Sequence, residues 1–394
     1  MDVRSSLRPQ RVLISAECFV PVVNGVTNSV LRVLEHLDRR GHDMLVVAPA
    51  PGPSSVTLPS GRTIRVVRLP SMKVPFYDGM HFSWPSERRC HEILRAYRPD
   101  VVHLAAPTLL GAQIGRAAQR SGVPSVAIFQ TDLAGFVQNY EGVGFSARWI
   151  WRWLRSVHNR ADVTLAPTPT LASELTRRGF SRVGVWGRGV DREQFTPDRR
   201  CERIRAQLAG TDDRPLVGYV GRLAAEKQVD RLAALRRLGD RHRLVIVGDG
   251  PDRPRLQRLL PDAHFTGMLR GEELGATMAS LDVFVHTGPH ETFCQAVQEA
   301  MAAGVPVVGP DAGGPRDLIV SGVTGWRFDP DRPAELVEAV ASLLESGPLR
   351  RTMGQAGFEA VADRTWENVG DDLLRHYAWA NGPAASIRTH VAAA

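Results

Sequence analysis

The chain has 394 residues, of which 43% are hydrophobic and 23% charged. This composition excludes a wholly disordered protein, and the length fits two domains better than one. No apolar run approaches the roughly 18 residues that a membrane-spanning helix needs. The formal net charge is +7, and residues 1–195 carry 25 basic against 15 acidic residues, a balance of +10. An anionic membrane surface or an anionic substrate could use this excess. Nucleic acid is not expected, because no nucleic-acid-binding motif is present.

The cysteine pattern points to a reducing compartment. The four cysteines lie far apart and form no C-x-x-C pair. They are too few to crosslink a chain of this length, and their spacing is not typical of a zinc site. We therefore expect a cytosolic protein without a structural metal.

Short apolar runs alternate with helical periodicity through the first half of the chain. A clear helix falls between the first two runs, with one apolar face over residues 26–37, Asn28 or Thr27 as its cap and Gly41 at its end. The strands predicted here cover residues 12–15, 44–48, 64–69, 101–103, 125–129, 163–166 and 183–186.

A second series of the same kind begins after residue 195. Its predicted strands cover residues 216–220, 243–247, 263–265, 283–286, 305–308 and 325–328. Strand–helix alternation indicates doubly wound parallel sheets, so the sequence predicts an α/β protein with two similar domains in tandem. Ligands of such sheets bind outside the carboxyl ends of the strands.

A candidate phosphate site follows the predicted strand 216–220. There Arg222 and Lys227 stand five residues apart in Gly-Arg-Leu-Ala-Ala-Glu-Lys. Two cations on one loop can converge on a diphosphate, the arginine as a planar fork and the lysine as a mobile point charge. Lys227 is also one of only two lysines among 49 basic residues. The alternative is an ordinary loop with solvated charges.

A pair of glutamates marks a second candidate site. Thr292 and Gln295 form a T-x-x-Q capping box, which predicts a helix that starts near Phe293 and whose open N–H groups would favour a phosphate or sugar oxygen. Helical geometry would leave Glu291 and Glu299 within about 80° around the axis and roughly 12 Å apart along it. Each could hold a different ring of an extended ligand. They are too far apart to act as an acid/base pair on one bond, because such a pair needs carboxylates about 5–9 Å apart. A solvated helix face is the alternative.

Two glycines and three polar residues at predicted strand ends give weaker signals. Gly248 and Gly25 each follow a strand and could let the backbone approach a ligand, or could be plain turns. Gln130 and Asp132 follow the strand 125–129 and indicate a polar spot at the same edge of the sheet. His103 closes the strand 101–103, where a histidine is more often a satisfied structural residue than a catalyst. No G-x-G-x-x-G follows a strand, so a nicotinamide cofactor is poorly supported.

The segment 148–155 combines three tryptophans with three arginines. A helix would place Trp149 and Trp153 on one side and the arginines on a neighbouring side. That combination suits a membrane interface. Tryptophans packed against the sheet, with arginines outside, are the alternative.

Together and in this order, these features resemble the family-4 retaining glycosyltransferases of GT-B architecture. The resemblance runs from the Asn-Gly-Val loop at Gly25 to Gly325, and its most specific part is the E-x7-E spacing of Glu291 and Glu299 with Arg222 and Lys227 upstream. Within the family, the segments 129–132, 186–191 and 293–299 are similar to the actinobacterial GDP-mannose-dependent α-mannosyltransferases, which build lipid-linked mannosides at the inner face of the membrane. Many members carry a histidine where this chain has Gln130, so no histidine-based role is carried over there.

The resemblance implies two Rossmann-like domains that face a central cleft. Residues 1–192 would form the acceptor-binding domain and residues 197–365 the nucleotide-sugar-binding domain, with a terminal helix at about 366–382 packed back on the first.

The resemblance also assigns roles to individual residues. Arg222 and Lys227 would hold the donor diphosphate, Glu299 the ribose hydroxyls, and Glu291 the transferred sugar. Other donor-binding positions would be Gly25, Gly248, Met268, Thr292, Phe293 and Cys294. Gln130, Asp132 and His103 are the acceptor-side candidates, and Asp132 joins Arg222, Lys227 and Glu291 as a catalytic candidate.

The activity implied is transfer of mannose from GDP-mannose to a membrane glycolipid. The nucleotide sugar would be a co-substrate, and neither a cofactor nor a metal is expected, because Arg222 and Lys227 can stabilise the leaving diphosphate. The protein would be cytoplasmic or peripheral on the inner face of the cell membrane. A UDP-sugar donor with a soluble natural-product acceptor, a nucleotide-sugar epimerase of the same fold, and a non-catalytic nucleotide-sugar-binding module are the alternatives.

Overall fold

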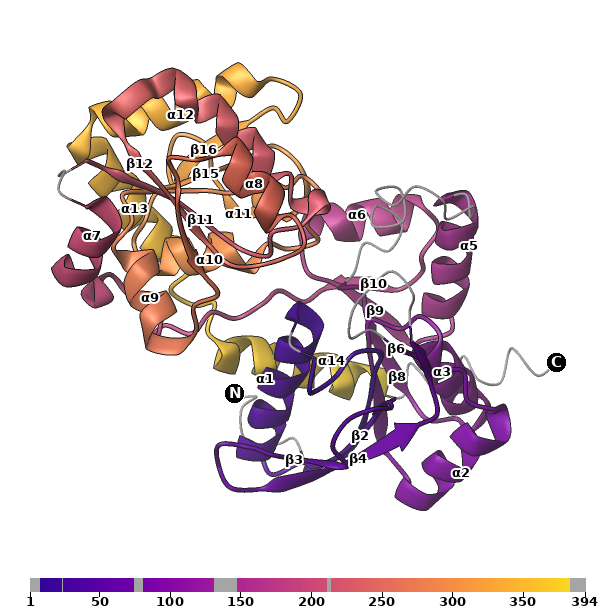
Figure 1. Cartoon of the computed structure of the whole chain (residues 1–394). Coiled ribbons are helices and arrows are strands. Elements are labelled where there is room, and N and C mark those ends of the chain that lie inside the picture. Colours follow the sequence, from indigo (N-terminus) through magenta and orange to yellow (C-terminus); the bar gives the residue numbers. More distant parts are fainter. Residues whose placement is uncertain (1–7, 23, 74–80, 131–146, 211–213, 383–394) are drawn as a thin grey trace. The chain divides into compact units, whose positions relative to one another are not determined.

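The computed structural model describes residues 8–22, 24–73, 81–130, 147–210 and 214–382. The chain divides into two compact units (Figure 1). Of the described residues, unit 1 contains those up to Gly187 together with the C-terminal stretch from Trp366, and unit 2 contains those from Arg188 to Thr365. None of the helices among the described residues combines the length and apolarity needed to cross a membrane.

Unit 1 is built on an eight-stranded sheet with the order β10-β9-β8-β7-β1-β2-β4-β3. Neighbouring strands are parallel except β3, which runs antiparallel to β4. The strands are β1 (Arg11–Ala16), β2 (Asp43–Pro49), β3 (Ser55–Thr57), β4 (Thr63–Leu69), β7 (Val101–Ala105), β8 (Ser125–Ile128), β9 (Val163–Ala166) and β10 (Val183–Val185). A separate antiparallel pair is formed by β5 (Met72–Lys73) and β6 (His81–Phe82). The helices are α1 (Gly25–Arg39), α2 (Glu87–Tyr97), α3 (Leu110–Arg120), α5 (Ala147–His158), α6 (Pro169–Arg177) and α14 (Trp366–Ala380).

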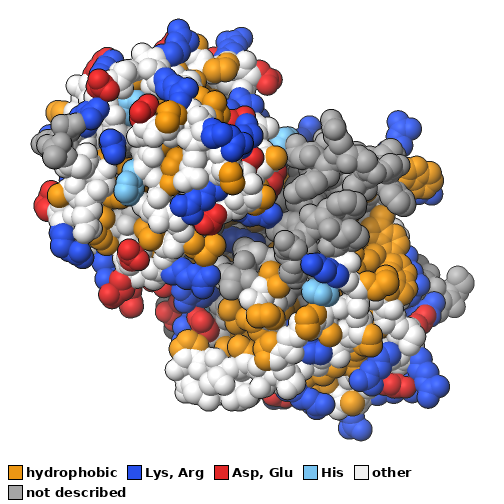
Figure 2. Space-filling model, viewed as in Figure 1, with side chains coloured by type: hydrophobic (Ala, Val, Ile, Leu, Met, Phe, Trp, Pro, Cys, Tyr) orange, Lys and Arg blue, Asp and Glu red, His pale blue; other side chains and the backbone are white. Residues whose placement is uncertain are grey.

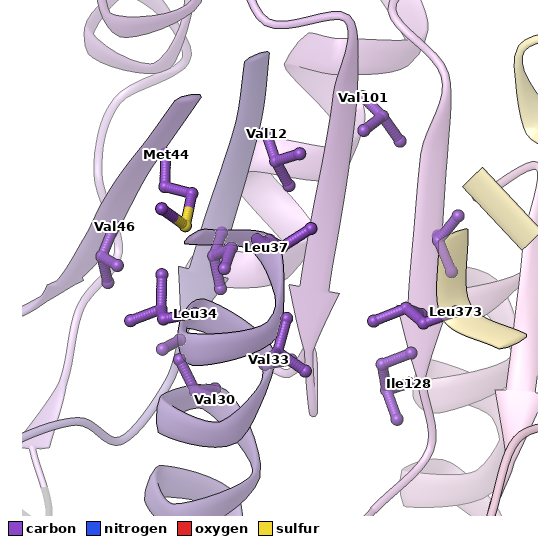
Figure 3. Close-up of a cluster of buried hydrophobic side chains, with 14 of the residues drawn as sticks. Val12, Val30, Val33, Leu34, Leu37, Met44, Val46, Val101, Ile128 and Leu373 are labelled. Atoms are coloured by element: carbon purple, nitrogen blue, oxygen red, sulfur yellow. The ribbon is translucent and has the colours of Figure 1, made fainter. Parts of the chain in front are cut away.

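Helix α1 shows why this sequence folds as it does. The side chain of Asn24 caps the helix by accepting hydrogen bonds from the backbone N–H groups of Val26 and Thr27. The prediction of Asn28 or Thr27 as the cap is therefore wrong, because the helix starts earlier. The apolar face then turns toward the sheet, where Leu34 and Leu37 are buried beside strands β1 and β2 (Figure 3). Burying each such side chain contributes about 1.5–3 kcal/mol.

Helix α14 completes unit 1 from the far end of the sequence. Leu373 lies in the same core as Ile128 of β8 (Figure 3), and Tyr377 is fully buried. The indole N–H of Trp186 donates to the backbone carbonyl of Val369 at 2.8 Å. The terminal helix is therefore part of the hydrophobic core of this unit.

Unit 2 is built on a six-stranded parallel sheet with the order β13-β12-β11-β14-β15-β16. Its strands are β11 (Leu216–Val220), β12 (Arg243–Val247), β13 (His264–Gly267), β14 (Val283–Val285), β15 (Val307–Pro310) and β16 (Gly325–Phe328). Its helices and helical turns are η2 (Pro197–Arg199), α7 (Glu202–Ala209), η3 (Ala225–Lys227), η4 (Val229–Arg241), α8 (Arg253–Leu259), α9 (Gly271–Ala279), α10 (Gln295–Ala302), α11 (Gly313–Leu318), α12 (Pro333–Glu345) and α13 (Gly347–Ala360). Two parallel α/β sheets in tandem confirm the predicted fold class.

Candidate functional site in unit 2

The candidate site lies at the point where the strand order of unit 2 reverses. The chain proceeds from β11 to β12 on one side, whereas β14 pairs with the other side of β11 and continues to β15. The loops that leave β11 and β14 therefore emerge together at the carboxyl edge of the sheet, where ligands of open α/β sheets bind. These loops carry the two predicted motifs, so the topology brings both to one place.

An ion pair joins the two loops. The Nζ atom of Lys227 lies 2.5 Å from Oε1 of Glu291. The hydroxyl of Thr287 donates to the backbone carbonyl of Lys227 at 2.8 Å. At Gly288 an added Cβ would lie 3.3 Å from the Cα of Lys227, so the backbones themselves are in close contact. Of the predicted site residues, Lys227 and Glu291 are thus in direct contact.

The electrostatics of this pair favour the charged forms of both groups. Burial raises the pKa of Glu291, but Lys227 and His286 outweigh that effect and lower the pKa to about 2. Burial lowers the pKa of Lys227, but the nearby carboxylate of Glu291 outweighs it and raises the pKa. A ligand that binds here therefore encounters an anion and a cation that lie side by side.

His286 is a site residue that the motifs did not single out. It follows β14 directly, and its Nε2 lies 3.3 Å from the Glu291 oxygen that Lys227 contacts. Its ring stacks on Tyr219 of β11 with 6.1 Å between ring centroids, and it is 3% exposed. The available signal was its position at the carboxyl end of a predicted strand, in the same loop as Glu291.

Arg222 lies in the loop that ends in Lys227. Its Nη1 atom is 3.8 Å from Oε1 of Glu226, and its side chain is 37% exposed. Its backbone carbonyl accepts a hydrogen bond from the hydroxyl of Tyr219 at 3.1 Å. The guanidinium is thus accessible while its backbone is fixed to the sheet.

The segment before α10 differs from the prediction. Helix α10 begins at Gln295 and not near Phe293, and Cys294 has a positive φ of 77°. The predicted capping box is therefore wrong: the side-chain amide of Gln295 donates to the backbone carbonyl of Gly189 at 3.0 Å. Since Glu291 lies outside the helix, the helical spacing between it and Glu299 does not apply either.

Glu299 lies on α10 in a half-buried environment. Burial raises its pKa, the side chain of Gln295 opposes the rise, the carboxylate of Asp191 adds to it, and the resulting value is about 8. The next side chain toward the N-terminus, Gln298, donates to the backbone carbonyl of Arg188 at 2.9 Å. A protonated carboxyl of this kind can both donate and accept hydrogen bonds, as vicinal hydroxyls do.

The loops after β12 and β13 lie beside the β11 loop. The backbone N–H of Gly248 donates to the carbonyl of Gly267 at 2.8 Å. Gly248 has a φ of 135°, and an added Cβ would lie 1.9 Å from the carbonyl oxygen of Gly221. Met268 follows β13 and is 60% exposed. The structure thus places Gly248 and Met268 at the same edge of the sheet as Lys227.

The remaining predicted residues belong to unit 1 or lie outside the described residues. Gly25 is the first residue of α1, and an added Cβ would meet nothing within 4 Å, so packing does not require a glycine there. Gln130 follows β8 and is 7% exposed. Asp132 lies outside the described residues.

The position of His103 differs from its prediction as a strand-end residue. Strand β7 continues to Ala105, so His103 lies in mid-strand and is 1% exposed. Its Nδ1 is 2.8 Å from the hydroxyl of Tyr377 on α14, and burial lowers its pKa to about 3. The contact with α14, 274 residues away, makes this histidine part of the core.

Three possible metal ligands meet in the described part of unit 2. Atoms of His286, Glu291 and Cys294 lie within 4.8 Å of one another. The ammonium of Lys227 already provides the cation that contacts Glu291. Burial raises the pKa of the Cys294 thiol well above its ordinary value, which disfavours the thiolate that a metal would bind. This donor set therefore fits a lysine-paired carboxylate better than a metal ion.

Known proteins resemble the chain along almost its whole length. A family model of glycosyl transferases group 1 matches residues 201–360, and one of glycosyltransferase family 4 matches residues 23–194. The chain is 51% identical over 371 residues to a GDP-mannose-dependent alpha-mannosyltransferase of Mycolicibacterium smegmatis, which covers 93% of this chain and 96% of that protein. It is 46% identical over 372 residues to a protein of the same name from Corynebacterium glutamicum, with 94% of this chain and 89% of that protein covered.

Solved structures support the architecture. The fold matches sucrose-phosphate synthase from Thermosynechococcus elongatus with a TM-score of 0.77 at 21% identity, covering 94% of this chain and 99% of that one. It matches HepE of Anabaena in complex with UDP and glucose with a TM-score of 0.75 at 18% identity, with the same coverage. The chain therefore belongs to the family 4 glycosyltransferases and has their fold of two parallel α/β sheets, known as GT-B.

Proposed function

We propose that this enzyme transfers mannose from GDP-mannose to a hydroxyl group of a membrane glycolipid and retains the configuration of the anomeric carbon. The observation that carries the proposal is the Lys227–Glu291 pair at the switch point of unit 2. About half of the residues are shared with GDP-mannose-dependent alpha-mannosyltransferases over more than nine tenths of this chain. A more distant relative, 30% identical, is a mannosyltransferase named for a phosphatidylinositol dimannoside.

In this proposal Arg222 and Lys227 stabilise the leaving diphosphate. Each cation has a carboxylate in ion-pair range, Glu226 and Glu291 respectively, so the loop positions them before a ligand arrives. Negative charge on the diphosphate grows as the sugar–phosphate bond breaks. Preorganised cations therefore act most strongly in the transition state, which is what accelerates a reaction.

The other residues hold the parts of the donor. Glu291, with the backbone of residues 292–294, binds hydroxyls of the transferred sugar, and Glu299 binds the ribose hydroxyls. Gly248 and Met268 contact the nucleoside, and Gly25 contacts a donor phosphate. Gln130 and Asp132 contribute to the acceptor side.

The reaction needs no protein nucleophile. The acceptor oxygen attacks the anomeric carbon from the face at which the diphosphate leaves. The bond between the anomeric carbon and the phosphate oxygen breaks, the bond to the acceptor oxygen forms, and the acceptor proton passes to the leaving phosphate. Because Arg222 and Lys227 neutralise this phosphate, the proposed reaction does not depend on a divalent cation, and turnover is expected to persist in EDTA.

A donor panel followed by a transfer assay tests the proposal. A ligand that binds only the folded state raises the melting temperature, so GDP-mannose is expected to raise it more than UDP-glucose or ADP-glucose does. Labelled mannose should then move from GDP-mannose into a membrane lipid extract. A larger shift with a UDP-sugar, transfer to soluble acceptors alone, or isomerised donor in the absence of acceptor would each refute the assignment.

A further inference from the structure

Helix α5 has one face in the core of unit 1 and another in solvent. On the inner face Leu154 is 3% exposed, and Trp151 stacks on Phe129 with 6.0 Å between ring centroids and 3° between the ring planes. On the outer face Trp149 is 63% exposed. The expectation of tryptophans packed against the sheet thus holds for Trp151 but not for Trp149.

The exposed aromatic surface extends beyond α5. Trp153, one helical turn after Trp149, stacks on Trp84 with 6.0 Å between centroids. Trp84 follows β6 and is itself 57% exposed, and Met72 on the paired strand β5 is 77% exposed. Figure 2 shows orange hydrophobic side chains with blue basic ones beside them at the right edge of the molecule, where Figure 1 draws α5. Exposed apolar groups gathered in this way mark an interaction site.

The charge on this surface is positive. Residues 147–158 contain three arginines and no acidic residue. Within the part of the chain that the structure describes, neither Arg148 nor Arg152 has a carboxylate within 4 Å. The guanidinium of Arg152 lies over the ring of Trp149, 6.0 Å from its centroid. Cationic and aromatic groups are therefore interleaved on one exposed face.

We propose that Trp84, Arg148, Trp149, Arg152 and Trp153, which we call the α5 surface, dock the protein on an anionic lipid bilayer. Indole rings favour the level of the lipid headgroups because they join a large apolar ring to one N–H donor. Arginines beside them pair with headgroup phosphates, and apolar area enters the boundary of the acyl chains. Exposed tryptophans and arginines also occur at protein interfaces, and absence of flotation with anionic vesicles would favour such a partner over the bilayer.

The inference agrees with a lipid-borne acceptor but does not depend on the reaction. Binding to vesicles is measured without donor or acceptor, so failure of the docking surface leaves the proposed mannosyl transfer standing, and the reverse also holds.

Flotation with the full chain tests the α5 surface. The protein is mixed with vesicles of phosphatidylcholine alone, or of phosphatidylcholine with phosphatidylglycerol, at low and high salt. We expect flotation with the anionic vesicles that weakens in high salt. Reversal of one charge, Arg152→Glu, should reduce the partition coefficient about tenfold, and Trp149→Ala should reduce it several-fold.

Matched variants in unit 1 control for general loss of charge or tryptophan. Arg65→Glu reverses an exposed charge on β4, near the other edge of the sheet, and Trp379→Ala removes a tryptophan that is 50% exposed on α14. Both should float like the unaltered protein, and melting curves with GDP should be alike for all four variants.

Three outcomes would overturn the inference. Equal flotation with neutral and anionic vesicles would remove the electrostatic component. Equal losses in the control variants would show that the α5 surface is not the binding face. A dimer that Trp149→Ala converts to a monomer, without vesicle binding, would assign this face to a second copy of the chain.

Discussion

Lys227 and Glu291 stand 64 positions apart in the sequence and 2.5 Å apart in the structure. Burial by itself would oppose the charged state of each, and their contact, together with His286 beside Glu291, makes both charges favourable. Removing one partner of such a pair strongly destabilises the folded protein, because the other charge is left buried without a counter-charge. At the scale of single residues, the charged state of each member of the pair therefore depends on the presence of the other.

Replacing either of the two cations of the site should slow catalysis. We expect Arg222→Ala and Lys227→Ala each to lower turnover by about 10²–10³-fold, the effect of losing one group that stabilises transition-state charge. Initial rates of labelled mannose transfer measure this. Arg237→Ala, an exposed arginine on η4, serves as the control, and rates like those of the unaltered enzyme in both site variants would contradict the mechanism.

His286 should act through Glu291. Because its Nε2 is 3.3 Å from the carboxylate, His286→Ala should lower turnover by about 10–100-fold, the range for losing a close polar contact with a charged group. His286→Gln, which keeps a donor, should recover part of the loss. The melting shift produced by GDP alone should be unchanged, whereas the additional shift produced by the mannose of GDP-mannose should fall; an equal loss of both shifts would indicate a merely structural role.

The element that shapes the sugar end of the site is the turn between β14 and α10. Cys294 adopts a positive φ there, and the backbone N–H of Gly314, in α11, donates to the carbonyl of Glu291 at 2.7 Å. The backbones approach so closely that position 314 requires a glycine, since an added Cβ at Gly314 would lie 1.9 Å from the carbonyl oxygen of Phe293. Helix α11 thus fixes the segment that carries Glu291.

Gly314→Ala should therefore displace this segment. We expect a loss of about 1–3 kcal/mol in the free energy of unfolding, as for overpacking in a rigid core, together with reduced turnover. Denaturant melts measure the first effect. Gly347→Ala is the matched control, because the nearest atoms there belong to the ends of flexible arginine side chains at 3.5 Å and 3.7 Å; equal stability of the two variants would contradict the close contact.

At the scale of the whole molecule, each unit holds a titratable group whose neutral form is favoured, with opposite consequences for the pH dependence of stability. Burial lowers the pKa of His103 in unit 1 to about 3. Burial is also the main cause that raises the pKa of Glu299 in unit 2 to about 8. Between pH 5 and 6.5 the unfolded chain binds more protons at the histidine than the folded chain does. This residue therefore makes the stability of the fold decrease as the pH falls. Between pH 5 and 8 the folded chain binds more protons at the glutamate, so stability falls as pH rises.

Single substitutions should expose these two slopes. Relative to the unaltered protein, His103→Gln should lose less stability when the pH drops from 7 to 5, by about 2 kcal/mol for 1.5 pH units below an ordinary histidine pKa. Glu299→Gln should lose less stability when the pH rises from 5 to 8. Urea melts at each pH give the stability of each variant relative to the unaltered protein. If this relative stability changed with pH in the same direction for both variants, one of the two shifted pKa values would be contradicted.

Local patterns in the sequence predict most of the elements and the chemical types of the site residues. Hydrophobic periodicity is a local property, so it placed the strands of both sheets within a few residues, and Arg222, Lys227, Glu291 and Glu299 carry their charges wherever the chain folds. The three-residue strand β3 and the pair β5–β6 were missed, because runs so short carry little periodic signal.

Tertiary structure decided the contacts between distant segments. The order of the strands in unit 2 joins Lys227 to Glu291, and it adds His286, which no motif marked. Cys294 adopts a left-handed conformation just before α10. In place of the predicted capping box, Gln295 donates to the distant backbone carbonyl of Gly189. Helix α14 covers His103 and turns a candidate site residue into a core residue. Each of these outcomes depends on which backbone packs against which, and that is a property of the folded chain that local patterns do not contain.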